Sequence, residues 1–297
     1  MPSMTHTAAL NKLVIIGVGL IGGSFAQALR SAGLVKHIVG VGRSQKNMQY
    51  AVELGVIDEI ASDIASALHH ADLVFLAMPV GQTKYIMEKI APHLQANTIV
   101  TDAGSTKQDV IAAARHCLSM QNRHHFVPGH PIAGAEQSGV LAAQPDLYLN
   151  KHVILTPLAE TSANAIEQVR QLWQACGAQV SLMPANEHDQ VLAATSHLPH
   201  ILAFTLMNHL SNASQPENML RFAGSGFRDF TRIASSSPEM WRDICLANRM
   251  TLLQQIDMYQ NELKALQAIL SNNDAKALEQ NFSRARSLRE EWLKNSI

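Results

Sequence analysis

Apolar and polar positions alternate along the first part of the chain in short blocks that predict strands followed by helices. The apolar block at 12–16 precedes a helical pattern at 22–31, and the continuous apolar block at 72–77 is typical of a strand buried on both faces of a parallel sheet. Such alternation indicates right-handed βαβ units and a doubly wound sheet. Further strands are predicted at 37–41, 98–101, 151–156 and 179–183, and further helices at 46–54, 81–91, 106–117 and 163–176.

The pattern changes near Pro184, after which only helical periodicity remains. Ser237-Pro238-Glu239 has the N-cap, first-turn proline and early acid of a helix start. Helices are predicted over 187–210, from this cap to about 270, and over 274–293. The sequence therefore predicts an α/β Rossmann domain over residues 11–184, followed by an all-α domain over residues 185–297.

A glycine-rich turn, Gly17-Val18-Gly19-Leu20-Ile21-Gly22, follows the first predicted strand and opens the first helix. That context is typical of a dinucleotide site. Gly17 permits the tight turn, Gly19 lets the backbone approach a pyrophosphate, and Gly22 lets the helix pack close to the strand. The N–H groups at the helix start, around Leu20 and Ile21, then face the phosphates. An incidental glycine turn is the alternative.

The end of the second predicted strand lacks the acid that usually binds the ribose 2′-hydroxyl of NAD. This place is occupied by Val41-Gly42-Arg43-Ser44. An arginine binds a 2′-phosphate that an acid would repel. We therefore predict that NADP is the preferred cofactor and NAD the alternative, bound with the help of Arg43 and Ser44. Alternatively, Arg43 is a solvated turn residue.

His130 lies between Gly129 and Pro131, a setting typical of a loop. A histidine there can take a proton from a substrate hydroxyl near neutral pH, although a structural loop histidine fits equally well. The histidines of the chain have no recognised zinc-ligand spacing, so no metal site is predicted.

In the helical domain, His197 and His200 are three positions apart and share one side of a helix that Pro199 is expected to kink. They could equally be polar groups satisfied at an interdomain surface. Asp229 and Arg232 are also three apart and can pair on one turn. An arginine held by an aspartate is a rigid fork for a carboxylate, and Arg228 is its competitor.

Composition excludes several classes of partner. The 297 residues are 47% hydrophobic and 16% charged, with a net charge of −1, which favours neither nucleic acid nor a membrane surface. No apolar run is long enough to predict a membrane span. The three cysteines form no C-x-x-C pair, so a disulfide framework is not expected and the cytoplasm is the default compartment.

Five segments, in chain order, resemble the prephenate/arogenate (cyclohexadienyl) dehydrogenases of tyrosine biosynthesis. They are Gly17–Ser24, Gly104-Ser105-Thr106-Lys107, Gly129–Gly134, Ser196–His200 and Gly226–Arg232. The resemblance runs from about Leu13 to Trp241. It implies a Rossmann domain followed by a helical dimerisation domain, a homodimer, and oxidative decarboxylation of a cyclohexadienyl acid with hydride transfer to a nicotinamide.

The resemblance also implies residue roles. It makes His130 the group that takes the proton of the substrate 4-hydroxyl, and Ser105 the residue that orients it. It makes Arg232 the ligand of a substrate carboxylate, with Asp229 as its partner. His200 and His197 would line the substrate pocket, and Glu136 would belong to an ionic network around it.

Position 135 is alanine where some members of the family carry threonine, which leaves the choice between prephenate and arogenate open. The chain has no segment for a fused regulatory or chorismate mutase domain, so we expect a monofunctional unit. Two alternatives stay open: a β-hydroxyacid-type dehydrogenase or imine reductase that relies on Lys107, and a non-catalytic Rossmann redox sensor.

Overall fold

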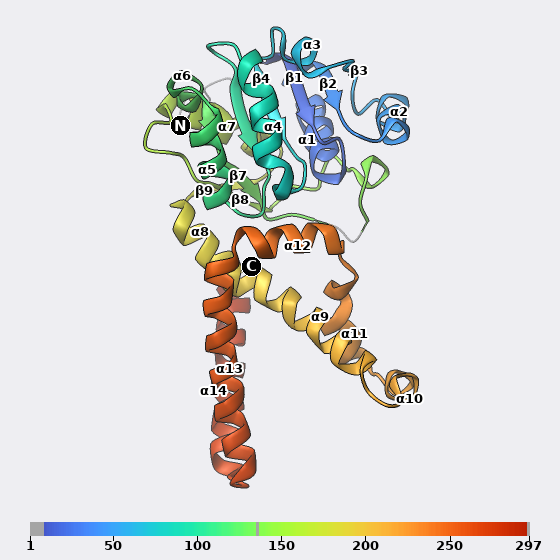
Figure 1. The fold of residues 1–297 in the computed structure, drawn as a ribbon, viewed down its shortest axis with the longest axis vertical. Helices are drawn as coiled ribbons and strands as arrows, with labels where there is room; N and C mark the ends of the chain where they lie inside the picture. The colour runs from blue at the N-terminus through green and yellow to red at the C-terminus, as the bar shows by residue number, and fades with distance from the viewer. Residues whose placement is uncertain (1–8, 135–136, 296–297) are drawn as a thin grey trace. The chain divides into compact units, whose positions relative to one another are not determined.

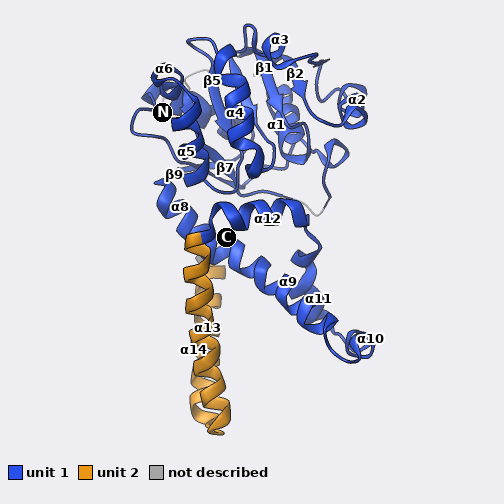
Figure 2. Cartoon of the chain, in the orientation of Figure 1, with its two compact units in different colours: residues 1–249 blue, residues 250–297 orange. Residues whose placement is uncertain are grey.

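The computed structural model describes residues 9–134 and 137–295. Contacts divide the chain into two compact units, residues 1–249 and 250–297 (Figure 2). Within the described residues, all strands lie in the first unit. The domain boundary expected near Pro184 separates strand-containing chain from purely helical chain inside this unit, and it stays a prediction.

The first unit is built on a six-stranded parallel sheet of order β3-β2-β1-β4-β5-β6 (Figure 1). Its strands are β1 (Leu10–Ile16), β2 (Val35–Val41), β3 (Glu59–Ile60), β4 (Leu73–Leu76), β5 (Ile99–Asp102) and β6 (Phe126–Val127). The order reverses between β1 and β4, and a doubly wound sheet binds its ligand outside the carboxyl ends of the strands at that point. The predicted Rossmann fold is confirmed.

Helices cover both faces of this sheet, because successive strand residues point to opposite sides. Leu13 and Ile15 of β1 belong to one apolar cluster, and Val14 and Ile16 to another. The first cluster holds residues of α1 (Leu20–Ser31), α2 (Gln45–Glu53) and α7 (Ala163–Ala175). The second holds residues of α3 (Ile64–Leu68), α4 (Thr83–Ile90) and α5 (Gln108–Cys117), and α6 (Met120–His124) follows α5.

A second, three-stranded sheet departs from the sequence prediction. The strands β8 (His152–Leu155) and β9 (Gln179–Leu182) do not extend the large sheet but pair with each other, and β8 also pairs with β7 (Gly129–Pro131). His130, expected in a loop, therefore lies on a strand opposite Ile154. The glycine and proline beside it suggested a loop, but β7 is a short edge strand, where a proline is tolerated.

The helical part of the first unit begins with α8 (Ala185–Leu192), a π-helical turn (Ala193–His197) and α9 (Leu198–Ser211). The single helix predicted over 187–210 is thus interrupted. The N–H of Leu198 bonds the Ala193 carbonyl five residues earlier, which is the π-helical spacing, and Pro199, which has no N–H, follows directly. The helices α10 (Pro216–Arg221), α11 (Ser225–Thr231) and α12 (Pro238–Ala247) follow.

The predicted helix start at Ser237 is confirmed, since the Ser237 hydroxyl accepts from the N–H of Met240. The helix does not continue to 270, however. It ends before Asn248, a buried residue outside helical geometry, and α13 (Arg249–Ser271) begins anew. The second unit is formed by α13 and α14 (Ala275–Asn295), which agrees closely with the last predicted helix. None of the helices in the described ranges has both the length and the hydrophobicity to cross a membrane.

Candidate active site

The turn between β1 and α1 has the backbone that a dinucleotide requires. Gly17 adopts φ +100°, and a Cβ there would lie 2.7 Å from the backbone of Ala77. A Cβ on Gly22 would meet the carbonyl of Gly17. Gly19, the N-cap of α1, has no atom within 4 Å of its would-be Cβ. The approach to the first N–H groups of α1 is open there, so the turn fits a pyrophosphate.

Arg43 and Ser44 follow β2 at the same edge of the sheet. With the Gln82 amide oriented to satisfy its hydrogen bonds, its oxygen accepts from both terminal nitrogens of Arg43 at 3.2 Å. Gln82 belongs to the turn after β4, so Arg43 reaches from one side of the strand reversal to the other. The hydroxyl of Ser44 caps α2 by accepting from the N–H of Asn47 at 3.3 Å.

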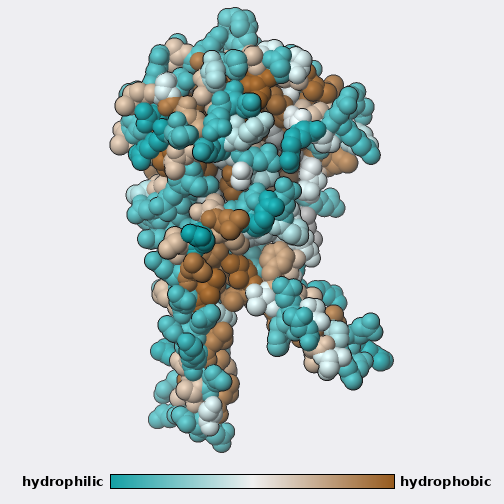
Figure 3. Space-filling view, in the orientation of Figure 1, coloured by the Kyte–Doolittle hydropathy of each residue, from teal (hydrophilic) through white to brown (hydrophobic). Residues whose placement is uncertain are grey.

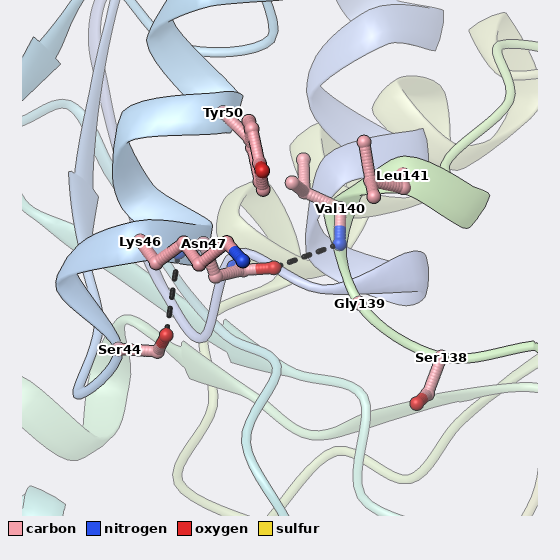
Figure 4. Close-up of a pocket in the computed structure, with 8 residues that line it drawn as sticks. All are labelled: Ser44, Lys46, Asn47, Tyr50, Ser138, Gly139, Val140 and Leu141. Atoms are coloured by element: carbon pink, nitrogen blue, oxygen red, sulfur yellow. Dashed lines mark hydrogen bonds between the residues drawn. The ribbon is translucent and has the colours of Figure 1, made fainter.

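A surface pocket lies beside Ser44 (Figure 4). Asn47 joins its two walls, since its Nδ2 donates to the Val18 carbonyl of the glycine turn at 2.6 Å and its Oδ1 accepts from the N–H of Val140 at 3.1 Å. The lining residues include the cation Lys46 and no acid, so the pocket favours an anionic group. They are Ser44, Lys46, Asn47, Tyr50, Ser138, Gly139, Val140 and Leu141.

A buried ion pair fixes the backbone just before His130. Asp102, the last residue of β5, accepts from the N–H of Gly104 at 2.7 Å and from that of Gly129 at 3.1 Å. The ammonium of Lys107 pairs with the same carboxylate and donates to the Gly129 carbonyl at 2.7 Å. Lys107 is fully buried and directed at these acceptors, so the geometry gives it a role in holding β7 and does not favour the lysine-dependent alternative.

The ring of His130 contacts helix α8. Its Nδ1 lies 2.8 Å from Nε2 of His188, whose Nδ1 lies 2.8 Å from Oδ1 of Asp189. Burial lowers the pKa of His130 well below its ordinary value, and the charges of His188, Lys107 and His197 lower it further. At neutral pH His130 is therefore a neutral ring that can accept a proton. Its Nε2 makes no hydrogen bond within the part of the chain that the structure describes.

Asp189 is a buried anion held by the N-terminus of α5. Its carboxylate accepts from the N–H of Lys107 at 2.8 Å and from that of Gln108 at 3.0 Å. Burial raises the pKa of Asp189, but the hydrogen bonds from His188 and from these two N–H groups outweigh it, so that the pKa lies below its ordinary value. A carboxylate at a helix N-terminus is also favoured by the helix dipole.

His197 forms a hydrogen bond with the backbone of Ser105 and lies close enough to Asp189 to be affected by its charge. Burial lowers the pKa of His197 to about 4, although the Asp189 charge and a hydrogen bond with the Ser105 backbone raise it. The amide of Asn248 donates to the Asp189 carbonyl at 2.7 Å and lies 3.3 Å from Nδ1 of His197. No hydrogen bond between the Ser105 hydroxyl and His130 exists in the described residues, so the orienting role of Ser105 stays a prediction.

His200 and Arg232 lie next along the helical part. The ring of His200 stacks on Trp241 with centroids 3.7 Å apart and 21° between the planes, and its Nδ1 donates to the Ser196 carbonyl at 2.9 Å. Burial lowers the pKa of His200, the bond to Ser196 raises it, and the charge of Arg232 lowers it. Arg232 is therefore close enough to act on His200 electrostatically.

His197 is close enough to act electrostatically on His130, and His200 on His197, so the three rings lie in one region, and their roles stay predictions. Two other expectations stay predictions as well. Glu136, with the neighbouring position 135, lies outside the described residues. Asp229 is exposed on α11, and its pairing with Arg232 stays a prediction. Across residues 9–134 and 137–295, no group of three or more histidine, cysteine, aspartate or glutamate residues is placed to hold a metal ion.

Sequence reasoning missed His188, Asp189 and Asn248. His188 lies 58 positions from His130, and Asp189 lies 81 from Gln108, so no local spacing reveals either contact. The one signal in the sequence is a pair of adjacent titratable residues inside a helix. Asn248 lies in what the periodicity predicts as continuous helix, and only the break between α12 and α13 exposes its role.

A Rossmann sheet with an open glycine turn and a neutral histidine at the same edge defines a nicotinamide-dependent dehydrogenase. Residues 25–182 match the family model described as prephenate dehydrogenase, nucleotide-binding domain, and residues 184–284 match prephenate dehydrogenase, dimerization domain. The chain belongs to the prephenate dehydrogenase family and is an oxidoreductase. The family resemblance, the fold class and the enzyme class predicted from the sequence are thereby confirmed.

Individual similar proteins belong to the same family of dehydrogenases. The chain is 39% identical to the prephenate dehydrogenase of Bacillus subtilis, covering 94% of this chain and 75% of the relative. It is 36% identical to the cyclohexadienyl dehydrogenase of Zymomonas mobilis, covering 93% and 94%. The crystal structure of prephenate dehydrogenase from A. aeolicus in complex with hydroxyphenyl propionate and NAD+ superimposes with a TM-score of 0.90 at 36% identity, covering 96% of this chain and 99% of that one.

Proposed function

We propose that this chain catalyses the NAD(P)-dependent oxidative decarboxylation of prephenate, arogenate or both, in tyrosine biosynthesis. The observation that carries the proposal is the buried, neutral His130 at the nucleotide-binding edge of the sheet, in a chain 39% identical to a prephenate dehydrogenase. The names of the relatives supply the substrate class, and His130 supplies the base that such a reaction needs.

The reaction requires the protein to supply one base and to position the substrate against the cofactor. A bound oxidised nicotinamide supplies the hydride acceptor. We assign His130 to draw off the proton of the 4-hydroxyl as that carbon is oxidised, and Ser105 to orient the hydroxyl. Since aromatisation makes the loss of carbon dioxide strongly downhill, most of the rate comes from the positioned base and the fixed geometry.

Arg232 is assigned to a substrate carboxylate, with His200 and His197 lining the pocket beside it. The charge of Arg232 lowers the pKa of His200, which supports a shared site for the two side chains. Stacking on Trp241 fixes the orientation of the His200 ring. Asp229 and Glu136 are assigned to orient Arg232 and to complete its ionic surroundings.

We assign the preference for NADP to Arg43 and Ser44. No acid follows β2, Arg43 stands at that point, and the pocket beyond Ser44 is lined by Lys46 without an acid among its lining residues. A 2′-phosphate placed there gains cationic and N–H partners, whereas the ribose hydroxyl of NAD lacks the carboxylate that usually binds it. NAD is then a poorer cofactor.

Purified protein should be mixed with prephenate or arogenate and with NADP or NAD, and reduced nicotinamide followed by absorbance. We expect turnover with at least one of the two acids and a higher kcat/KM with NADP, accompanied by carbon dioxide and an aromatic product. A folded protein that binds the nucleotide yet turns over neither acid would contradict the proposed substrate. A strong preference for NAD would contradict the assignment of Arg43.

A further inference from the structure

Three side chains form a continuous chain of hydrogen bonds that ends at the proposed base. His130 contacts His188, His188 contacts Asp189, and Asp189 is held by two backbone N–H groups at the start of α5. The side chains of His130, His188 and Asp189 are 8% exposed or less, and we call these three residues the imidazole–carboxylate chain. Buried groups in such a network have little freedom to exchange partners with water.

The order of protons along this chain follows from its anionic end. A carboxylate only accepts, and that of Asp189 already accepts from the backbone of Lys107 and Gln108. His188 must therefore donate from Nδ1. In a neutral ring its Nε2 then carries a lone pair, so His130 must donate from Nδ1. Nε2 of His130 is left with the lone pair, which is the form of histidine that can take a proton.

From this geometry we infer that His188 and Asp189 are positioning residues for the reaction, which fix the tautomer and orientation of His130 and stabilise its protonated form. The inference rests on the proposed function for its chemical step. His188 and Asp189 touch no reacting atom and act only through His130.

In this scheme His130 takes one proton from the substrate and gives it back to the product. As the C–H bond of the hydroxyl-bearing carbon breaks and its electron pair leaves as hydride, the O–H bond breaks, a C=O bond forms, and Nε2 of His130 takes the proton. The bond to the ring carboxylate then breaks, carbon dioxide leaves, and its electron pair makes the ring aromatic. The ring oxygen becomes a phenolate and takes the proton back from His130. No net proton is released to solvent.

The charged groups around His130 determine how readily its ring is protonated. Asp189 favours the protonated ring through His188, while Lys107 and His197 oppose it when charged, and Asp102 offsets Lys107. Because Asp189 is the anion at the end of the chain, its loss makes His130 harder to protonate and shifts the acidic limb of the kcat–pH profile to lower pH.

The sharpest test replaces Asp189 by asparagine. Oδ1 of Asp189 faces Nδ1 of His188 and accepts from the N–H of Lys107, and Oδ2 accepts from the N–H of Gln108. An amide must therefore set its NH₂ group against one of these donors, and it carries no charge. The protonated form of His130 then loses the anion at the end of its chain. We expect kcat to fall roughly 10²-fold or more with little change in KM, and the acidic limb to move to lower pH.

Two further variants separate positioning from simple packing. In His188→Gln the amide oxygen can accept from His130 and the amide nitrogen can donate to Asp189, so we expect a milder loss in kcat, of roughly tenfold. Asp109→Asn, a half-buried carboxyl in the first turn of α5, is the matched control, and we expect it to stay within about twofold of the wild type. Equal losses in Asp189→Asn and Asp109→Asn, without a shift of the acidic limb, would overturn the inference.

A second readout does not depend on turnover. In the free protein with ¹⁵N-labelled histidine, long-range NMR spectra should show His130 protonated on Nδ1 in the wild type, with the resonance assigned from His130→Asn. A wild-type His130 protonated on Nε2, the order that a cationic His188 would impose, would overturn the inference. Failure of the wild type to turn over either acid would instead contradict the proposed function, and the NMR result would still decide the proton order.

Discussion

At the scale of single residues, the site depends on a few charges whose neighbours lie far away in the sequence. The sequence predicts His130, His197 and His200 because each belongs to a recognisable motif. It does not predict that the first two are buried and held neutral, since the pKa shifts come from burial and from His188 and Lys107. Both neighbours reach His130 only through the tertiary fold.

At this scale, a substitution of Arg43 tests the predicted preference for NADP over NAD. In Arg43→Ala, kcat/KM with NADP should fall about 10- to 100-fold, which corresponds to the loss of charge-assisted hydrogen bonds worth about 1.5–3 kcal/mol. The same constant with NAD should change less than about twofold, because the ribose hydroxyl gains nothing from this cation. Steady-state kinetics with both nucleotides measure the two effects. Arg115→Ala, an exposed arginine on α5, is the control. Equal losses with both nucleotides would assign Arg43 a structural role instead.

At the scale of elements, the periodic segments were predictable and the departures from periodicity were not. Four strands of the large sheet, β1, β2, β4 and β5, and the longer helices that cover it follow from apolar blocks and glycine turns, whereas the two-residue strands β3 and β6 and the short helix α3 were not predicted. The three-stranded sheet was not predicted either, because the pairing of β7 with β8 is a long-range choice that no local pattern encodes. Pro199 marked the place where α8 and α9 meet, although not the π-helical turn itself. The break at Asn248 also escaped prediction, since Asn248 is held by contacts with Asp189 and His197 that lie more than 50 positions away.

Two glycine substitutions in the β1–α1 turn distinguish an effect on cofactor binding from an effect on folding. Gly19→Ala should fold normally, because Gly19 has a negative φ and nothing lies within 4 Å of the added Cβ. Its dissociation constant for NADP should nevertheless rise at least about tenfold, because the added methyl group meets the pyrophosphate.

Gly17→Ala is the matched comparison. Its φ of +100° and the Ala77 backbone at 2.7 Å make this substitution strained whatever the cofactor does, so we expect a loss of about 2 kcal/mol or more in stability. Thermal unfolding with and without NADP, together with equilibrium binding, measures both variants. Normal binding by Gly19→Ala would contradict the placement of the pyrophosphate.

At the scale of the whole molecule, the C-terminal helices expose several large apolar side chains. Figure 3 shows hydrophobic side chains at the surface of the C-terminal helices. The exposed large apolar residues of the second unit include Met250, Leu253, Met258, Leu263, Leu270, Phe282 and Leu288. We propose that this surface is covered in a homodimer, which accords with the match of residues 184–284 to a dimerization domain.

Light scattering on the purified protein should therefore give twice the chain mass of 32.4 kDa. The double variant Phe282→Glu/Leu288→Glu should shift the mass toward that of the single chain, because two buried carboxylates would oppose association. Leu54→Glu, an exposed leucine just after α2, should leave the mass unchanged. A wild-type mass of one chain at all concentrations would contradict the homodimer.

The most direct measurement compares kcat for the wild type and His130→Asn, with saturating substrate and nucleotide. Asparagine is polar and of similar size but cannot hold the proton, so kcat should fall about 10²- to 10⁴-fold while KM changes much less. His124→Asn, an exposed histidine, should retain the wild-type rate. A near-normal kcat in His130→Asn would show that another group takes the hydroxyl proton and that the site is organised differently.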